Sequence, residues 1–155
     1  MSKRWDNHFL KMAHVHAMMS KDPNTKVGSV IIGADRELIS AGFNGFPRGI
    51  EDSKERLNDR ETKLKLVVHA EMNAVLSAAK FGIKLDKTTL YLVATDGDFI
   101  WGGPPCHRCT VEIIQAGIKE VVSHPFKNVP SKWSESINLS QRLLHEAGVV
   151  YREVT

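Results

Sequence analysis

Apolar residues recur at helical spacing, every third or fourth position, in four stretches of the chain. In the first stretch, Trp5, Phe9, Met12 and Ala13 fall on one side of a helical wheel, with polar residues between them. Each of the other three stretches is followed by a glycine, the residue that most often ends a helix. The spacing therefore predicts helices over residues 4–19, 67–81, 106–116 and 135–147.

Short runs of β-branched and apolar residues lie between these stretches, which is the pattern of buried strands. Strands are expected over residues 27–32, 38–43, 88–95, 119–123 and 149–154. A short turn over residues 33–36 joins the first two runs, so they predict an antiparallel hairpin. Helices separate the last three runs, which predicts right-handed parallel crossovers. The predicted fold is one domain over residues 1–155, a three-layer α/β/α sandwich with a mixed five-stranded sheet.

The connecting segments differ in character. Residues 50–66 are dense in charge of both signs, which predicts a solvated loop, a short helix, or a mobile flap whose basic residues meet an anion. Residues 42–49 are rich in glycine, which favours a shaped substrate loop over a plain turn because glycine lets the backbone approach a ligand. Residues 96–105 and 124–132 are expected to form irregular loops.

The composition narrows the class of protein. At 42% hydrophobic and 25% charged residues, the chain resembles ordinary soluble globular proteins. The net charge of +3, from 21 basic and 18 acidic residues, is small and scattered. It suits small anionic substrates and weakens the case for a nucleic-acid partner. No apolar run approaches membrane-spanning length and the first residues are polar, so we expect a cytoplasmic protein with no membrane partner.

The two cysteines of the chain, Cys106 and Cys109, fall at the start of a predicted helix, and His69 and Glu71 fall at the start of another. Cysteines three residues apart project their thiols from one face of a helix. Helix N-termini carry partial positive charge and stabilise thiolates. Two such helix starts directed at one point would form a site for a cation with anionic ligands.

The number of ligands indicates the type of site. His69, Cys106 and Cys109 make three, whereas a structural zinc site normally has four and a catalytic one keeps a position open for water. His107 lies on a different side of the helix and is a poor fourth ligand. A thioredoxin-like redox pair would follow the first strand, but this pair follows the third. The pattern therefore predicts a catalytic zinc whose water has a lowered pKa, with Glu71 passing the proton to a ring nitrogen and a leaving amine.

The combination of H-x-E with P-C-x-x-C is similar to the signature of zinc deaminases that act on cytosine or adenine. Residues 20–28, 42–49 and 113–121 carry a narrower resemblance. With them, the chain resembles the deoxycytidylate (dCMP) deaminase branch of the zinc-dependent cytidine deaminase superfamily. The similarity covers nearly the whole chain.

This resemblance implies an α/β/α sandwich that hydrolyses dCMP to dUMP and ammonia. It implies zinc ligation by His69, Cys106 and Cys109, with Glu71 as the catalytic proton shuttle. The substrate contacts expected from it are Asn44 for the sugar, Thr25 and Val27 beside the base, Ala70, and Lys21 or Arg60 for the phosphate. It also implies a homo-oligomer, either a dimer or a hexamer, with dCTP and dTTP as effectors, and leaves open Mg²⁺ bound with a nucleotide effector.

One segment departs from the family pattern. Residues 96–104 lie between the third strand and the P-C pair, where members of the family run on directly. This segment leaves open whether the substrate is dCMP, dCTP or a 5-substituted dCMP. It also leaves open whether Phe99 and Trp101 stack on a base or pack against another subunit. Two further functions stay open: deamination of a base within RNA or single-stranded DNA, and regulatory nucleotide binding without turnover.

Overall fold

One mixed β-sheet runs through the computed structural model, which describes residues 2–126 and 131–155. The strands are β1 (Lys26–Ile32), β2 (Leu38–Phe43), β3 (Thr89–Thr95), β4 (Ile100–Trp101), β5 (Glu120–Ser123) and β6 (Val150–Glu153). Their order is β2-β1-β3-β5-β6, with β4 paired to β3. β1 is antiparallel to β2 and β3, whereas β3, β5 and β6 are parallel. The predicted hairpin and parallel crossovers are confirmed.

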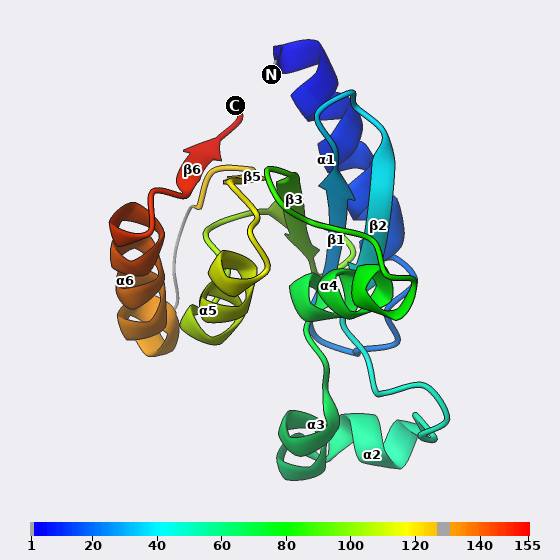
Figure 1. Cartoon of the computed structure of the whole chain (residues 1–155). Helices are drawn as coiled ribbons and strands as arrows, with labels where there is room; N and C mark the ends of the chain where they lie inside the picture. The colour runs from blue at the N-terminus through cyan, green and yellow to red at the C-terminus, as the bar shows by residue number, and fades with distance from the viewer. Residues whose placement is uncertain (1, 127–130) are drawn as a thin grey trace.

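Helices cover both faces of this sheet (Figure 1). They are α1 (Lys3–Ala17), α2 (Lys54–Asn58), α3 (Arg60–Leu66), α4 (Ala70–Lys80), α5 (His107–Gln115) and α6 (Ser131–Glu146). On one face, Phe9 and Leu10 of α1 are buried in a cluster with Tyr91 of β3. On the other face lie α4 and α5, and α6 packs beside α5. The predicted three-layer arrangement is confirmed. Among the described residues, no helix has the length and apolar character needed to cross a membrane.

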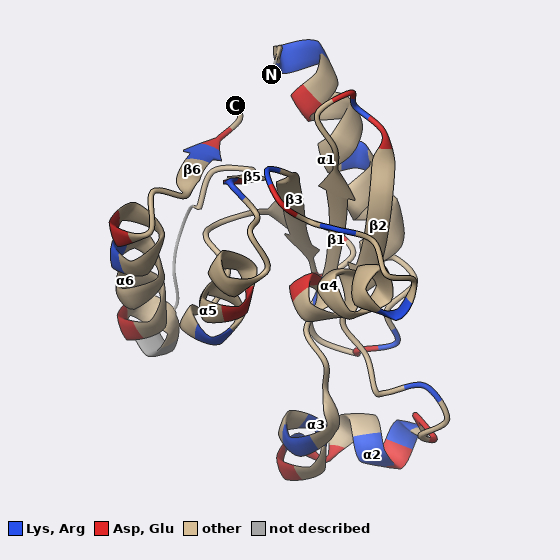
Figure 2. Ribbon diagram, in the orientation of Figure 1, with Lys and Arg blue, Asp and Glu red and all other residues tan. Residues whose placement is uncertain are grey.

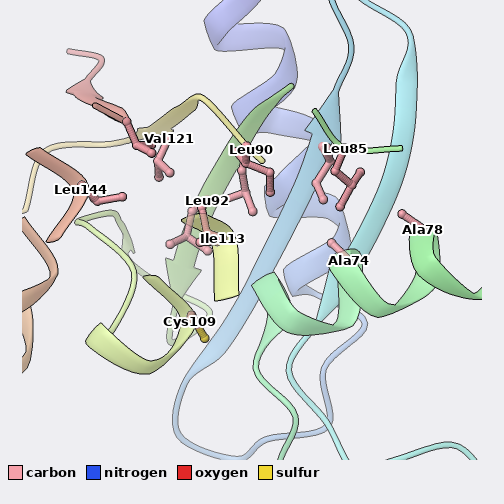
Figure 3. Close-up of a cluster of buried hydrophobic side chains, with 12 residues drawn as sticks. Ala74, Ala78, Leu85, Leu90, Leu92, Cys109, Ile113, Val121 and Leu144 are labelled. Atoms are coloured by element: carbon pink, nitrogen blue, oxygen red, sulfur yellow. The ribbon is translucent and has the colours of Figure 1, made fainter. Parts of the chain in front are cut away.

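The core on the α4 and α5 face contains one of the two cysteines (Figure 3). Leu90 and Leu92 of β3 meet Ala74 of α4 and Ile113 of α5 there, and all four are buried. Cys109 belongs to the same cluster and is 2% exposed. The second half of the P-C-x-x-C motif is therefore part of the hydrophobic core.

The prediction of an irregular loop over residues 96–105 is wrong in part, because this segment contains β4. The carboxylate of Asp96 accepts hydrogen bonds from the N–H groups of Asp98 and Phe99, at 3.0 and 2.8 Å. These bonds form a tight turn that reverses the chain. Trp101 then pairs with Ala94, and the sheet gains a short sixth strand.

Several helix starts also differ from the prediction. The helix expected over 67–81 begins at Ala70, because Val68 is extended and exchanges two backbone hydrogen bonds with Gly45, at 2.8 and 3.1 Å. The helix expected from Glu135 begins at Ser131. Part of the loop expected over 124–132 lies outside the described residues.

The charged segment forms the two short helices α2 and α3, which project away from the sheet (Figures 1 and 2). Ser53 caps α2 and Asp59 caps α3, each accepting a hydrogen bond from a backbone N–H group of the helix that follows. Leu57 is the one buried residue of α2, and α3 has none. The short-helix alternative is therefore confirmed, and we call this pair the α2–α3 arm.

A buried ion pair joins α1 to the last strand. Both carboxylate oxygens of Asp6 accept hydrogen bonds from the guanidinium of Arg152, at 2.8 Å each. Tyr91 donates a further hydrogen bond to Asp6 at 2.7 Å, and Arg152 also donates to Glu120 at 2.7 Å. The Asp6 side chain is 3% exposed, so its charge depends on these partners rather than on water.

Arg152→Met should leave this buried carboxylate without its cation. We expect the free energy of unfolding at pH 7 to fall by about 3 kcal/mol, the usual effect of breaking a buried ion pair. Urea denaturation measures the change. Lys65→Met is the control, because it removes an exposed pair with Glu61 and should leave the stability nearly unchanged.

The same pair predicts a dependence on pH. Burial alone raises the pKa of Asp6, but the hydrogen bonds from Arg152 and Tyr91 outweigh it and hold the pKa below its usual 3.8. The ionised carboxylate therefore stabilises the fold above about pH 4, and this contribution is lost as the pH falls through the folded-state pKa. The stability difference between wild type and Asp6→Asn should shrink below about pH 4. A constant difference down to pH 3 would contradict this account.

Candidate metal centre

Three side chains from the starts of two helices converge on the α4 and α5 face of the sheet. Nδ1 of His69 lies 3.5 Å from Sγ of Cys106 and 3.3 Å from Sγ of Cys109. All three ligand atoms lie within 4.8 Å of one another, and the described residues contain no other such group of three. The residues that the sequence predicts as metal ligands are thus brought together.

Local helix geometry leaves two of these side chains available to bind a metal ion. His69 is the N-cap residue of α4 and Cys106 is the N-cap residue of α5. Neither side chain makes a capping hydrogen bond, so imidazole and thiol point at each other instead. Cys109 lies one turn further along α5 and reaches the same point. His107 turns away and hydrogen-bonds Ser136 of α6, which agrees with its exclusion as a ligand.

The start of α4 rests directly on the sheet. Ser29 of β1 donates a hydrogen bond to the carbonyl of Ala70 at 2.8 Å. A Cβ atom on Gly42 of β2 would lie 2.4 Å from the same carbonyl oxygen, so only glycine permits this approach. The residue next to His69 is thereby fixed against two strands. Sequence reasoning missed these supports, although a glycine inside a strand is a known sign of close backbone approach.

The spacing of the ligand atoms fits zinc. Around a tetrahedral zinc ion, with bonds of about 2.05 Å to nitrogen and about 2.3 Å to sulfur, nitrogen and sulfur lie about 3.6 Å apart. The observed separations of 3.3 and 3.5 Å are close to this value. Nitrogen and sulfur donors suit zinc, whereas Mg²⁺ and Ca²⁺ take oxygen. Three protein ligands are the number found in catalytic zinc sites.

The cluster favours an anionic sulfur beside a charged imidazole. The hydrogen bond with Cys109 and the neighbouring His69 lower the pKa of the Cys106 thiol below its usual 9.0. The hydrogen bond with Cys106 raises the pKa of His69 from 6.5 to about 9. The hydrogen bond with Cys106, and then burial, raise the pKa of Cys109. A divalent cation bound here would replace these protons, as it does in other His and Cys sites.

Glu71 lies in the first turn of α4, two residues after His69, and is 5% exposed. Burial raises the pKa of its carboxyl group, although the charge on His69 acts in the opposite direction. The Cys109 thiol also lies within hydrogen-bonding reach of this carboxyl. A carboxyl group held beside the metal ligands and away from bulk water has the position that a proton shuttle requires.

Asn44 braces the start of β1. Its Oδ1 accepts a hydrogen bond from the N–H of Val27 at 2.7 Å, and its Nδ2 donates one to the carbonyl of Thr25 at 2.9 Å. Ser20 donates a further one to the Asn44 carbonyl at 2.8 Å. The structure thus gathers three of the predicted substrate residues into one unit. This structural role of Asn44 was not predicted, and its contact with a sugar stays a prediction.

The residues predicted to bind phosphate lie at the surface. Lys21 is 68% exposed and pairs with Asp52 at 3.0 Å, while Arg60 begins α3 and is exposed. Lys63 was missed by sequence reasoning: it pairs with Asp22 at 3.2 Å, and both side chains are largely buried. Lys21 and Lys63 line a cavity of about 360 Å³. The residues that line it include Asn44 but none of the three candidate metal ligands.

A three-ligand site between two helix starts of an α/β/α sandwich is the arrangement of a catalytic zinc protein. The family profile described as "cytidine and deoxycytidylate deaminase zinc-binding region" matches residues 3–124. Human deoxycytidylate deaminase is 31% identical over 154 residues, which cover 96% of this chain and 79% of the human protein. The chain therefore belongs to the cytidine and deoxycytidylate deaminase family, and both this match and the donor set support zinc as the metal.

Two further comparisons agree with this membership. An uncharacterised deaminase from Aliivibrio fischeri is 36% identical over 151 residues, which cover 96% of this chain and 92% of that protein. The fold is similar to that of dCMP deaminase from the cyanophage S-TIM5 in complex with dCMP and dUMP. That likeness has a TM-score of 0.74 and 23% sequence identity, and covers 99% of this chain and 98% of the phage chain.

Replacing Cys106 with serine should abolish tight zinc binding, because it removes one of three ligand atoms. We expect purified Cys106→Ser to hold less than about a tenth of the wild-type zinc, since the loss of even a supporting residue around a ligand weakens affinity tenfold or more. Inductively coupled plasma mass spectrometry measures the content. His107→Ala, at the next position, is the control and should keep full zinc. Equal zinc in wild type and Cys106→Ser would remove Cys106 from the ligand set.

Proposed function

We propose that this chain hydrolyses dCMP to dUMP and ammonia, with Glu71 as the proton shuttle and His69, Cys106 and Cys109 as the zinc ligands. The observation that carries the proposal is the convergence of these three ligands beside the buried carboxyl group of Glu71. It is supported by the human relative named deoxycytidylate deaminase. It is also consistent with the fold shared with a dCMP deaminase that binds dCMP and dUMP.

The reaction exchanges the amino group at C4 of cytosine for oxygen. A C–O bond forms from water, the C–N bond breaks, and dCMP plus water becomes dUMP plus ammonia. When bound, zinc supplies a water molecule whose pKa lies near neutrality. Glu71 accepts one proton from that water and delivers it to N3 of the base; it then takes the second proton from the hydroxyl group gained at C4 and passes it to the departing amine, so that C4 is left as a carbonyl. Because Glu71 is buried, the proton passes between these atoms rather than to bulk water.

The proposed substrate contacts are those that the family resemblance implies. The start of β1, where Asn44 holds Thr25 and Val27, is proposed to border the base and the sugar. The backbone of Ala70, between His69 and Glu71, is proposed to face the base. Lys21 is the proposed phosphate contact and Arg60 is the alternative. Either dCTP or a 5-substituted dCMP remains an alternative substrate.

A mononucleotide suits the surface better than a nucleic acid does. The α2–α3 arm mixes basic and acidic residues rather than presenting a basic stripe (Figure 2). The net charge of the chain is +3. Nucleic-acid surfaces usually concentrate positive charge along one face. An RNA or single-stranded DNA substrate would share the same chemistry and remains the alternative that an oligonucleotide assay tests.

Assembly and regulation complete the proposal. We propose that residues 1–155 act as one domain and assemble into a homo-oligomer, either a dimer or a hexamer. We also propose that dCTP and dTTP act as effectors, with Mg²⁺ accompanying a bound nucleotide, and that the protein is cytoplasmic. The assembly and effector proposals rest on the family resemblance. Light scattering after size exclusion, with and without dCTP and Mg²⁺, tests the assembly and its response.

Glu71→Gln keeps the shape of the side chain and removes its ionisable group. Ammonia release from dCMP should fall at least about a hundredfold, the usual effect of removing a general acid or base. The zinc content should not change. Glu61→Gln, whose side chain is 79% exposed in a pair with Lys65, is the control and should keep its turnover. A zinc-loaded Glu71→Gln that turns over like the wild type would refute the mechanism.

Lys21→Ala tests the phosphate contact. Losing a hydrogen bond to a charged group weakens binding by about 1.5–3 kcal/mol, so the KM for dCMP should rise by about tenfold or more. The kinetic constants for deoxycytidine, which lacks the phosphate, should stay the same. Lys65→Ala is the control, because Lys65 pairs with Glu61 on the α2–α3 arm. If dCMP and deoxycytidine respond equally to Lys21→Ala, Lys21 does not contact the phosphate.

A further inference from the structure

The register of the sheet assigns Trp101 to the same face as the metal centre. Residues directly opposite each other in an antiparallel pair present their side chains on one face. Trp101 lies opposite Ala94, and Ala94 lies opposite Val27. Val27 packs against the core cluster that contains Cys109 and Leu92. Because Leu92 and Ala94 are two residues apart on β3, they share this face, and so does Trp101.

Ile100, which precedes Trp101, confirms that successive side chains of β4 point to opposite faces of the sheet. Ile100 lies opposite Thr95 and should therefore face the α1 side of the sheet. It lines a cavity of about 310 Å³ there, together with His124 and Val154. Val154 belongs to the core cluster on the α1 side. Two adjacent residues of β4 thus point to opposite faces, and only Trp101 points to the metal side.

Close packing holds Trp101 in place. A Cβ atom on Gly102 would lie 2.1 Å from the carbonyl oxygen of His124, so the chain after Trp101 touches the backbone beyond β5. Gly103 has a φ of +134° and its N–H donates a hydrogen bond to the buried Ser123 at 3.0 Å. The chain then reaches Cys106 through two buried prolines. Trp101 is therefore fixed relative to the metal ligand that lies five residues after it.

The indole of Trp101 is partly exposed although its strand is held tightly. No other aromatic ring among the described residues stacks on it. Trp5 differs, because it stacks on Phe9 and carries the guanidinium of Arg36 over its ring. A large planar side chain that is closely packed, partly exposed and turned toward a catalytic face is suited to contact a base.

Resting on the proposed function, we propose that Trp101 is a specificity-determining residue that contacts the C5 edge of the cytosine base and limits substituents at C5. C4 carries the amino group and must face the metal centre. N3 and C5 flank C4 on its two sides, and N3 must face Glu71, which enters from α4. C5 therefore faces the α5 side, where β4 and Trp101 lead into Cys106.

Trp101→Ala tests the assignment by comparing dCMP with 5-methyl-dCMP. The smaller side chain makes room for the methyl group and removes a contact to the unmodified base. One methyl group in a hydrophobic pocket changes kcat/KM by about 10- to 200-fold, so the 5-methyl-dCMP to dCMP ratio of kcat/KM should rise at least about tenfold. The change should appear mainly in KM. Trp101→Phe should restore most of the wild-type ratio.

Ile100→Ala is the matched control, because it alters the adjacent residue on the opposite face and should leave the ratio unchanged. A second readout is the quenching of tryptophan fluorescence by dCMP, which Trp101→Phe should largely remove. This second readout decides the matter if Trp101→Ala does not fold.

The outcomes are distinguishable. If the wild type is active and Trp101→Ala leaves the 5-methyl-dCMP to dCMP ratio of kcat/KM unchanged, the inference about Trp101 is wrong but the proposed function stands. The same holds if dCMP still quenches the tryptophan fluorescence of Trp101→Phe fully. A change of oligomeric state without a change of ratio also overturns it and makes Trp101 an interface residue. A zinc-loaded wild type that releases no ammonia from any cytosine nucleotide overturns the proposed function itself.

Discussion

The contact between the start of α4 and the bare backbone of the sheet sets the position of everything at the metal centre. Gly42 has no side chain there, and Ser29 ties the Ala70 carbonyl to β1. His69 is therefore held by main-chain geometry rather than by its own packing. α5 must then arrive at the same sheet edge with Cys106 as its N-cap residue. The parallel crossover from β3 to β5, on the same face of the sheet as α4, brings it there.

The metal centre and the hydrophobic core share residues, and this links chemistry to packing. Cys109 is buried among Leu92 and Ile113, while its sulfur faces His69. A ligand held by a packed core cannot rotate away when the metal leaves, so the site is organised before it binds. Such organisation reduces the reordering that binding requires.

Sequence reasoning predicted the main helices, the strands, the topology and the residues of the candidate metal centre, because periodicity and motif spacing are local properties of the chain. It missed β4, since two residues are too few to read an alternating pattern. It missed the hydrogen bonds of Asn44 with Thr25 and Val27, which depend on two neighbouring strands meeting at one end. It also missed the pair of Lys63 with Asp22, residues 41 positions apart that only the folded chain brings together. The roles proposed for the substrate residues depend on how a bound nucleotide lies, which neither local sequence patterns nor the fold alone determine.

The ion pair between Asp6 and Arg152 has a consequence for how the protein is made. The two residues are 146 positions apart, so Asp6 is synthesised well before its partner. At ribosomal speeds of about 5–20 residues per second, α1 waits on the order of ten seconds before β6 emerges. During that time the Asp6 carboxylate has no cation to accompany it into the core. The helix α1 can pack on β1 and β3 during this time, but the ion pair that ties it to β6 forms only once β6 appears.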